Sequence, residues 1–170
     1  EDRSFYYRDR VYSYQQHENP DASLAFQREV INHILPQVEP DIVHCHDWMT
    51  GLIPAAARRL GIPSVFTLHN IHTERISLAH MEHLGIDAPD FWQSLYYERY
   101  PENYEESRDH NRVDLLASGI QASDHVNTVS PTFLDEMING WQGDLPVVIR
   151  EHLAGMREGG SACGILNAPH

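Results

Sequence analysis

The stretch that decides the fold is DIVHCHDW, residues 41–48. A short apolar run passes directly into polar and titratable side chains and ends on the indole of Trp48. This pattern is typical of a buried strand that delivers functional groups to its carboxyl end, and ligands of open α/β sheets bind outside those ends. The stretch therefore predicts a strand and, just after it, part of a ligand crevice.

Three further segments repeat this pattern. They are residues 64–68 followed by His69-Asn70, residues 125–129 followed by Ser130-Pro131, and residues 163–166 followed by Asn167. Parallel strands joined by right-handed crossovers place their carboxyl ends on one side of a sheet, so the four sets of polar residues are expected at one rim. The predicted fold class is α/β, a Rossmann-like parallel sheet with helices on both faces.

Between these strands the apolar spacing changes to that of helices. The sequence predicts helices at residues 21–35, 50–60, 75–84, 91–97, 112–122, 132–138 and 146–157. Asp21 is the expected N-cap of the first, Phe26 and Ile34 belong to its apolar face, and Pro36 marks the loop that follows it.

Two segments are less regular. Residues 1–20 are expected to form an N-terminal arm or strand. Residues 96–104, rich in tyrosine and acidic side chains, predict a surface loop. Its aromatic rings either pack the loop onto the domain or line a sugar or base pocket, and the sequence leaves both open.

Composition narrows the function classes. The chain has 170 residues, and 25 acidic residues against 12 basic ones give a net charge of −13, which argues against a nucleic-acid partner. No apolar run approaches the roughly 20 residues of a membrane helix. All the basic residues are arginine, so these residues hold neither a P-loop lysine nor a Schiff-base lysine. Cys45 and Cys163, each in a predicted buried strand, suggest free thiols in a reducing compartment.

Three constellations are candidates for chemistry. His44, His46 and Asp47 resemble the ligand set of metal hydrolases, and a metal-dependent hydrolase is therefore one alternative. The pair His69-Asn70 suits general acid-base work or hydrogen bonding to a hydroxyl-rich ligand. Ser130 is an expected helix N-cap, and the helix that it starts could also bind an anion.

Four blocks of this sequence, in their order and separations, resemble the bacterial glycogen synthase and plant starch synthase family. They are PDIVHCHDWMTGLIPA at 40–55, SVFTLHN at 64–70, SGIQASDHVNTVSPTF at 118–133 and CGILNAP at 163–169. Members are retaining glucosyltransferases that extend an α-1,4-glucan from a sugar nucleotide, normally ADP-glucose. Two Rossmann-like domains face each other across a cleft in these enzymes, which is the GT-B fold.

The resemblance implies that residues 1–170 form a single partial domain, the back half of the N-terminal, acceptor-side domain. It implies an ADP-glucose donor, an α-glucan acceptor and a C-terminal domain of the same protein as partners. It implies no cofactor and no metal, and a cytoplasmic location, or a plastid for a plant protein.

Individual residues carry over from the family motifs. His69 matches the histidine near the transferred glucose and is the expected catalytic residue. Asp47 and Trp48 match the acidic and aromatic pair on the acceptor side, and Asn70 matches the neighbouring polar contact. Asn167 matches the asparagine of the family's Ile-Leu-Asn turn. Ser130, the expected N-cap of a helix that could bind an anion, completes the expected substrate-binding set.

The sequence also departs from the family pattern. The family's Lys-x-Gly-Gly loop would precede residue 1, and the domain with most donor contacts would follow residue 170. Ala117 stands where the family usually has lysine, and residues 71–75 replace its Leu-Ala-Tyr-Gln-Gly. The resemblance thus implies a divergent member whose fragment is inactive alone. A non-catalytic glucan-binding domain is the second alternative.

Overall fold

The computed structural model describes residues 18–143 and 145–166. Its main sheet contains β1 (Val43–His46), β2 (Ser64–Leu68), β5 (His125–Thr128) and β6 (Ala162–Gly164). The strand order is β1-β2-β5-β6 and all three pairings are parallel. The α/β class and the parallel sheet are therefore confirmed. Of the predicted N-terminal arm, residues 1–17 lie outside the described residues.

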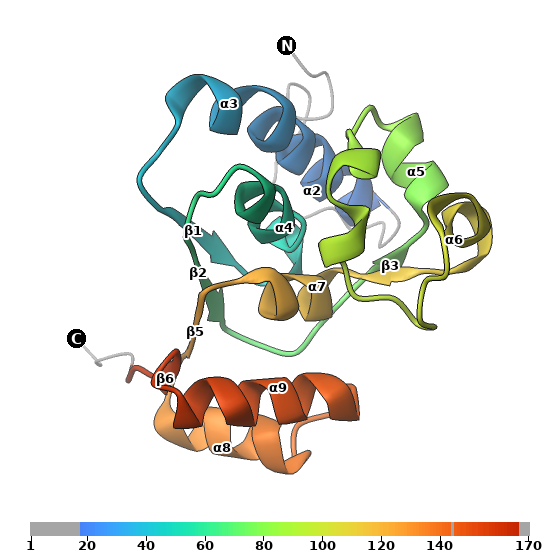
Figure 1. The fold of residues 1–170 in the computed structure, drawn as a ribbon. Helices are drawn as coiled ribbons and strands as arrows, with labels where there is room; N and C mark the ends of the chain where they lie inside the picture. The colour runs from blue at the N-terminus through green and yellow to red at the C-terminus, as the bar shows by residue number, and fades with distance from the viewer. Residues whose placement is uncertain (1–17, 144, 167–170) are drawn as a thin grey trace.

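Helices connect these strands and cover the sheet. α4 (Ile53–Arg59) lies between β1 and β2, α7 (Leu115–Ala122) precedes β5, and α8 (Pro131–Asn139) and α9 (Val147–Glu158) lie between β5 and β6. Figure 1 shows α4, α7 and α9 on the same side of the sheet. The buried row beneath them runs across all four strands as Cys45, Phe66, Val126 and Ala162.

The next row of the sheet points to the opposite face. It consists of His46, Thr67, Asn127 and Cys163. His46 and Cys163 are exposed and Asn127 is half-buried. Cys163 was predicted to be buried, but β6 is the last strand in the order, so its side chain on this face reaches solvent. Cys45 is buried, as predicted.

The first helical segment is longer than predicted. It runs through α2 (Glu18–Glu29), a π-helical turn η1 (Val30–Ile34) and α3 (Leu35–Val38), so residues 18–20 are helical and Pro36 lies inside the last turn. A π turn loosens the i→i−4 ladder, and a proline, which lacks the N–H, is tolerated there. Phe26 and Ile34, predicted to lie on the apolar face of this helix, are exposed.

The middle of the chain differs most from the prediction. Arg75–Ile76 is a strand, β3, paired antiparallel with β4 (Val113–Asp114). The predicted helix at 75–84 is therefore reduced to α5 (Leu78–His83), and that at 112–122 to α7. Pairing with a distant segment overrode the local helical pattern.

Residues 88–110 also differ from the sequence-based expectation. The predicted helix at 91–97 is only the short 3₁₀ turn η4 (Trp92–Ser94), which follows another such turn, η3 (Ala88–Asp90). A helix that was not predicted, α6 (Tyr104–His110), begins at the N-cap Asn103, whose side chain accepts a hydrogen bond from the Glu106 N–H.

The remaining helices follow the prediction closely. Residues 50–60 contain the end of a 3₁₀ turn, η2 (Trp48–Thr50), and then α4. The predictions at 132–138 and 146–157 are confirmed by α8 and α9. Ile165 and Leu166, predicted to lie in the last strand, come after β6 and are exposed.

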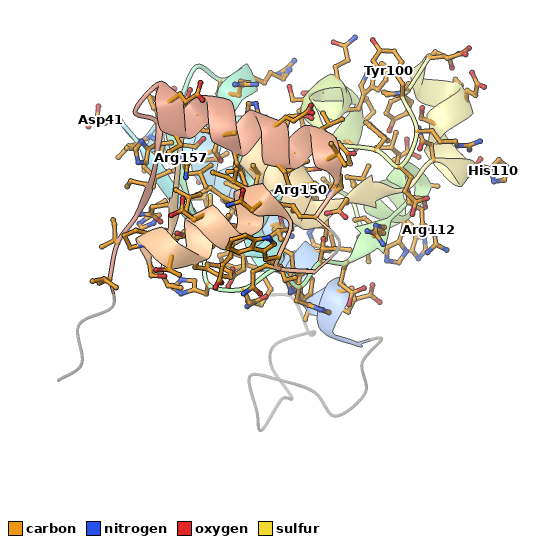
Figure 2. All side chains as sticks on the ribbon, turned by 90° about the horizontal axis from the view of Figure 1, so that it is seen from below. Asp41, Tyr100, His110, Arg112, Arg150 and Arg157 are labelled. Carbon is orange, nitrogen blue, oxygen red and sulfur yellow. The ribbon has the colours of Figure 1, made fainter. Side chains whose placement is uncertain are left out.

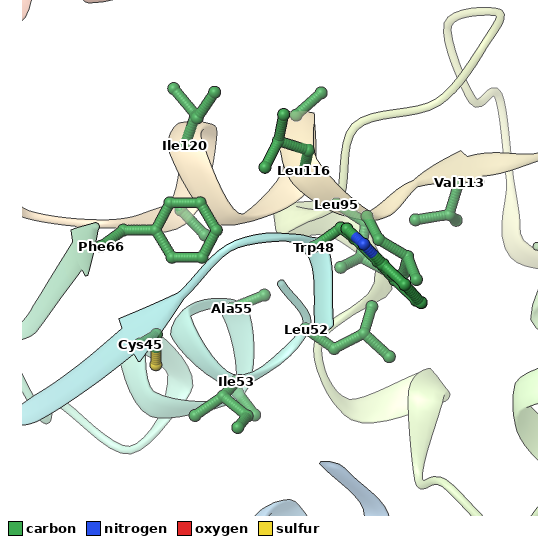
Figure 3. Close-up of a cluster of buried hydrophobic side chains, with 14 of the residues drawn as sticks. Cys45, Trp48, Leu52, Ile53, Ala55, Phe66, Leu95, Val113, Leu116 and Ile120 are labelled. Atoms are coloured by element: carbon green, nitrogen blue, oxygen red, sulfur yellow. The ribbon is translucent and has the colours of Figure 1, made fainter. Parts of the chain in front are cut away.

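The core lies between the sheet and its helices. Figure 3 shows Phe66 beside α7, which carries Leu116 and Ile120, and Cys45 beside α4. The approach of α7 to β2 is close, since a Cβ placed on Gly119 would lie 2.3 Å from the Phe66 ring. Within the described residues, no helix is long and apolar enough to cross a membrane.

Candidate functional site

The carboxyl ends of β1, β2 and β5 meet at one rim of the sheet. His46 is aligned with Thr67, and Leu68 with Thr128. The residues that follow these strand ends are Asp47, His69 and Val129-Ser130. The rim therefore gathers residues that lie more than 80 positions apart in the sequence.

Asp47 ties two of these strand ends together. Its backbone adopts φ 53° and ψ −177°, a region that almost only glycine populates, so the backbone of Asp47 is strained. The side chain is only 5% exposed, and its Oδ1 accepts a hydrogen bond of 2.8 Å from the His69 N–H. Asp47 thus holds the backbone that carries His69.

His69 is exposed at the end of β2 and contacts a second histidine. Its Nε2 lies 3.1 Å from Nδ1 of His46, and the two rings are stacked with centroids 5.4 Å apart. Partial burial, followed by the neighbouring His44 and His69, lowers the pKa of His46. A neutral His46 can share one hydrogen with His69, so Nδ1 is the His69 ring nitrogen left for a ligand.

The three residues considered as metal ligands each form a hydrogen bond with a different partner. His44 Nε2 lies 2.7 Å from Thr67 Oγ1, His46 bonds to His69, and Asp47 accepts from the backbone. Across residues 18–143 and 145–166 the structure holds no group of three or more His, Cys, Asp or Glu side chains that could bind a metal ion. These contacts give the metal-dependent hydrolase no support.

A hollow of about 710 Å³ begins beside His69, at Asn70. We call it the rim hollow; it is lined by residues 70–73, Arg75, Asp114, Leu116, Gly143, Leu145 and Pro146. The Asn70 side chain stabilises the turn at its mouth, because its Oδ1 accepts a hydrogen bond of 2.8 Å from the His72 N–H.

Trp48 is mostly covered by protein. Its side chain is 7% exposed and belongs to the core, and its ring meets His72 edge-on with centroids 5.8 Å apart. Its direct contact with a substrate remains a prediction. In the structure the Trp48 ring packs against His72, and His72 lines the rim hollow. Trp48 therefore supports the wall of the hollow from behind.

Asp114 is a site residue that the sequence analysis missed. It is buried, and its carboxylate accepts hydrogen bonds from Thr73 Oγ1 at 2.7 Å, from Arg75 Nε at 3.1 Å and from the Ala117 N–H at 3.0 Å. It caps α7 and fixes the wall of the rim hollow. An acidic residue just before Leu115-Leu116 is the signal of an N-cap that could have located it.

The remaining predicted residues lie elsewhere on the rim or outside the described chain. Ser130 is the N-cap of α8, as predicted, and its Oγ accepts a hydrogen bond of 3.0 Å from the Phe133 N–H. Its contact with a substrate is still a prediction. Asn167 lies outside the described residues.

Known proteins share this fold and these motifs. The family model described as the starch synthase catalytic domain matches residues 1–150. This chain belongs to the starch synthase catalytic domain family. The family predicted from the four sequence blocks is thereby confirmed.

Sequence identity and coverage describe how similar the chain is to individual members of the family. The chain is 31% identical to a glycogen synthase of Halalkalibacterium halodurans, covering 98% of this chain and 32% of that protein. It is 35% identical to a glycogen synthase of Variovorax paradoxus, covering 78% of this chain and 25% of that protein.

A solved structure is similar as well. It is the catalytic domain of Starch Synthase IV from Arabidopsis thaliana bound to ADP and acarbose, with a TM-score of 0.64 and 26% identity, covering 94% of this chain and 31% of that one. The chain therefore has the fold of part of a starch synthase catalytic domain, and it spans about a quarter to a third of the length of these relatives.

Proposed function

We propose that this chain is the acceptor-side part of a retaining glycosyltransferase that extends an α-1,4-glucan from a nucleotide-linked glucose. Family membership supports the reaction class. The observation that carries the proposal is the position of His69, which is exposed at the carboxyl end of β2 and directly precedes Asn70, a lining residue of the rim hollow. The ADP and acarbose in the Arabidopsis structure are the grounds for choosing ADP-glucose as donor and a glucan as acceptor.

In this proposal the reaction proceeds with retention. The nucleotide diphosphate leaves, and the 4-hydroxyl of the glucan attacks the glucose from the same face. Most of the stabilisation acts on the developing oxocarbenium ion and the departing phosphate. His69 assists at the transferred glucose through Nδ1, while Asp47 and His46 hold its backbone and its ring.

The proposal also predicts the activity of the 170-residue chain when it is studied alone. A transferase gains much of its rate by holding both substrates together. The chain spans about a third of its relatives, so we propose that it needs a C-terminal domain of the same protein as a partner. We expect weak glucan binding and no transfer from the chain alone, and a cytoplasmic location for the whole protein.

The test is His69→Ala in the full-length protein. We expect kcat to fall at least tenfold, a loss of about 1.4 kcal/mol or more of transition-state stabilisation. The free energy of unfolding should change by less than about 1 kcal/mol, because the exposed ring makes one side-chain hydrogen bond in the described structure. Incorporation of glucose into glycogen and thermal melts measure the two quantities.

His83→Ala is the matched control, since His83 is an exposed histidine near the end of α5. It should leave kcat unchanged. A melt that collapses in His69→Ala while kcat per folded molecule holds would show that His69 is structural. Glycogen binding without any transfer by the wild-type protein would favour the non-catalytic glucan-binding alternative.

A further inference from the structure

A second hollow lies beside the rim hollow and is lined by aromatic side chains. It encloses about 630 Å³ between residues 92–102, α7 and the start of α9. We call it the aromatic hollow. The side chains that line it include Trp92, Tyr96, Glu98, Tyr100, Glu102 and Gln121. A hollow of this size with aromatic walls and a few polar groups is typical of a small-ligand site.

In the tyrosine-rich segment, residues 96–104, one tyrosine is buried against the core and another is open to solvent. Tyr97 is 5% exposed and donates a hydrogen bond of 2.8 Å to the Trp92 carbonyl, so it packs the segment onto the core. Tyr100 is 93% exposed, and Figure 2 shows it on the loop beside α6 at the margin of the molecule. Tyr97 therefore packs the loop onto the domain, as one alternative predicted, and Tyr100 leaves its ring open to solvent beside the hollow.

The backbone that presents Tyr100 is held in place. The Asn111 side chain accepts a hydrogen bond of 3.0 Å from the Arg99 N–H and donates one of 2.8 Å to the Arg99 carbonyl. The Glu98 N–H donates to the Arg112 carbonyl at 2.9 Å. An aromatic ring on a fixed backbone loses little entropy when a ligand stacks on it, which favours binding.

The charges around the hollow select the ligand. Glu98, Glu102 and Arg99 line it, so the hollow carries two carboxylates and one guanidinium rather than the cluster of cations that favours a phosphate-bearing ligand. Carboxylate and amide oxygens accept hydrogen bonds from hydroxyl groups, and the Gln121 amide lies in the same wall. Open aromatic faces beside such acceptors suit a neutral, hydroxyl-rich ligand.

The two hollows share a wall. Arg75 and Asp114 line the rim hollow, and Arg75 Nε lies 3.9 Å from Oε1 of Glu98, which lines the aromatic hollow. The start of α9 contributes to both, through Pro146 on one side and Val148 on the other. The two hollows are therefore neighbours, separated by Arg75 and Glu98 and by the start of α9.

We propose that the aromatic hollow is an accessory binding site for α-1,4-glucan, with Tyr100 as its stacking residue. The choice of glucan rests on the proposed function, because a growing glucan is the neutral, hydroxyl-rich chain that would occupy the neighbouring rim hollow. The site holds the acceptor several glucose units away from the reacting end. It contributes to acceptor affinity and not to the chemical step.

The experiment compares Tyr100→Ala, Tyr100→Phe and wild type in the full-length protein. Glycogen and maltoheptaose are the binding probes, measured by affinity electrophoresis and calorimetry. We expect Tyr100→Ala to weaken glycogen binding at least fivefold and to raise KM for glycogen, with kcat and KM for ADP-glucose unchanged. Tyr100→Phe keeps the ring and should bind within twofold of wild type. Melts of all variants should coincide, since Tyr100 is exposed.

Trp141→Ala is the matched control, because Trp141 is a 75% exposed aromatic residue just beyond α8 and lines neither hollow. It should bind glycogen like wild type. Unchanged glycogen binding by Tyr100→Ala, or an equal loss in Trp141→Ala, overturns the accessory site. If wild type transfers no glucose but Tyr100→Ala alone loses glycogen binding, the proposed reaction fails and the site stands.

Discussion

At the scale of single residues, Asp47 shows how one side chain can link two strand ends of a site. It sits at a positive φ directly after β1 and bonds to the backbone of His69 after β2. Strain of this kind persists where the surroundings fix the backbone, and here they fix the position of the candidate catalytic histidine. In the proposed reaction, His69 takes part in the chemistry and Asp47 positions its backbone.

Replacing Asp47 should separate these roles. Asp47→Ala removes the acceptor of the His69 N–H, so we expect a loss of about 2 kcal/mol in the free energy of unfolding. Asp47→Asn keeps an acceptor for that N–H and should cost under about 1 kcal/mol. Urea unfolding of both variants measures this, and equal losses in the two would contradict the assignment.

At the scale of elements, the distance between α7 and β2 depends on one glycine. Phe66 fills the space that a side chain at residue 119 would need, as the 2.3 Å approach shows. The start of α7 also packs closely on a glycine, because a Cβ on Gly51 would lie 2.0 Å from the Leu115 carbonyl oxygen. Residues 71–75, which precede α7 in the chain, depend on this packing through Thr73 and Asp114.

Two glycine substitutions test this packing against helix propensity. Gly119→Ala should destabilise the fold by about 1–3 kcal/mol, because the added methyl group overpacks the core. Gly155→Ala, in α9 with no atom within 4 Å of the added Cβ, should stabilise it by up to about 1 kcal/mol. Thermal melts report both, and two shifts of the same sign would mean that packing at Gly119 does not control the spacing.

At the scale of the whole molecule, two distant histidines link stability to pH. His46 on β1 and His152 on α9 both have a pKa below the ordinary value of 6.5, and partial burial is the largest cause at each. The second cause is His44 for His46 and Arg58 for His152. The unfolded chain therefore binds protons at a higher pH than the folded one at both positions.

This linkage gives a pH dependence with a definite sign. Stability is fully present above about pH 6.5 and is lost as the pH falls from there toward the lower folded pKa values. We expect the urea midpoint to decrease between pH 7.5 and 5.5, and less steeply in the double variant His46→Gln, His152→Gln. The double variant His33→Gln, His83→Gln, at two exposed histidines, is the control and should keep the wild-type slope.

The sequence by itself determined the parts of this protein that depend on neighbouring residues. The four strands and their polar ends follow from short apolar runs, and α8 follows from Ser130 at its start and Gly140 after its end. The family followed from four blocks whose order and spacing lie in the sequence itself. These signals are local, so folding does not alter them.

Only the tertiary structure decided the rest, because those features depend on which distant segments meet. The pairing of Arg75–Ile76 with Val113–Asp114 replaced the start of two predicted helices and made Asp114 a site residue. The position of β6 at the end of the sheet exposed Cys163. Packing against the core buried Tyr97 and left Tyr100 open, although the two lie three residues apart in the same aromatic run.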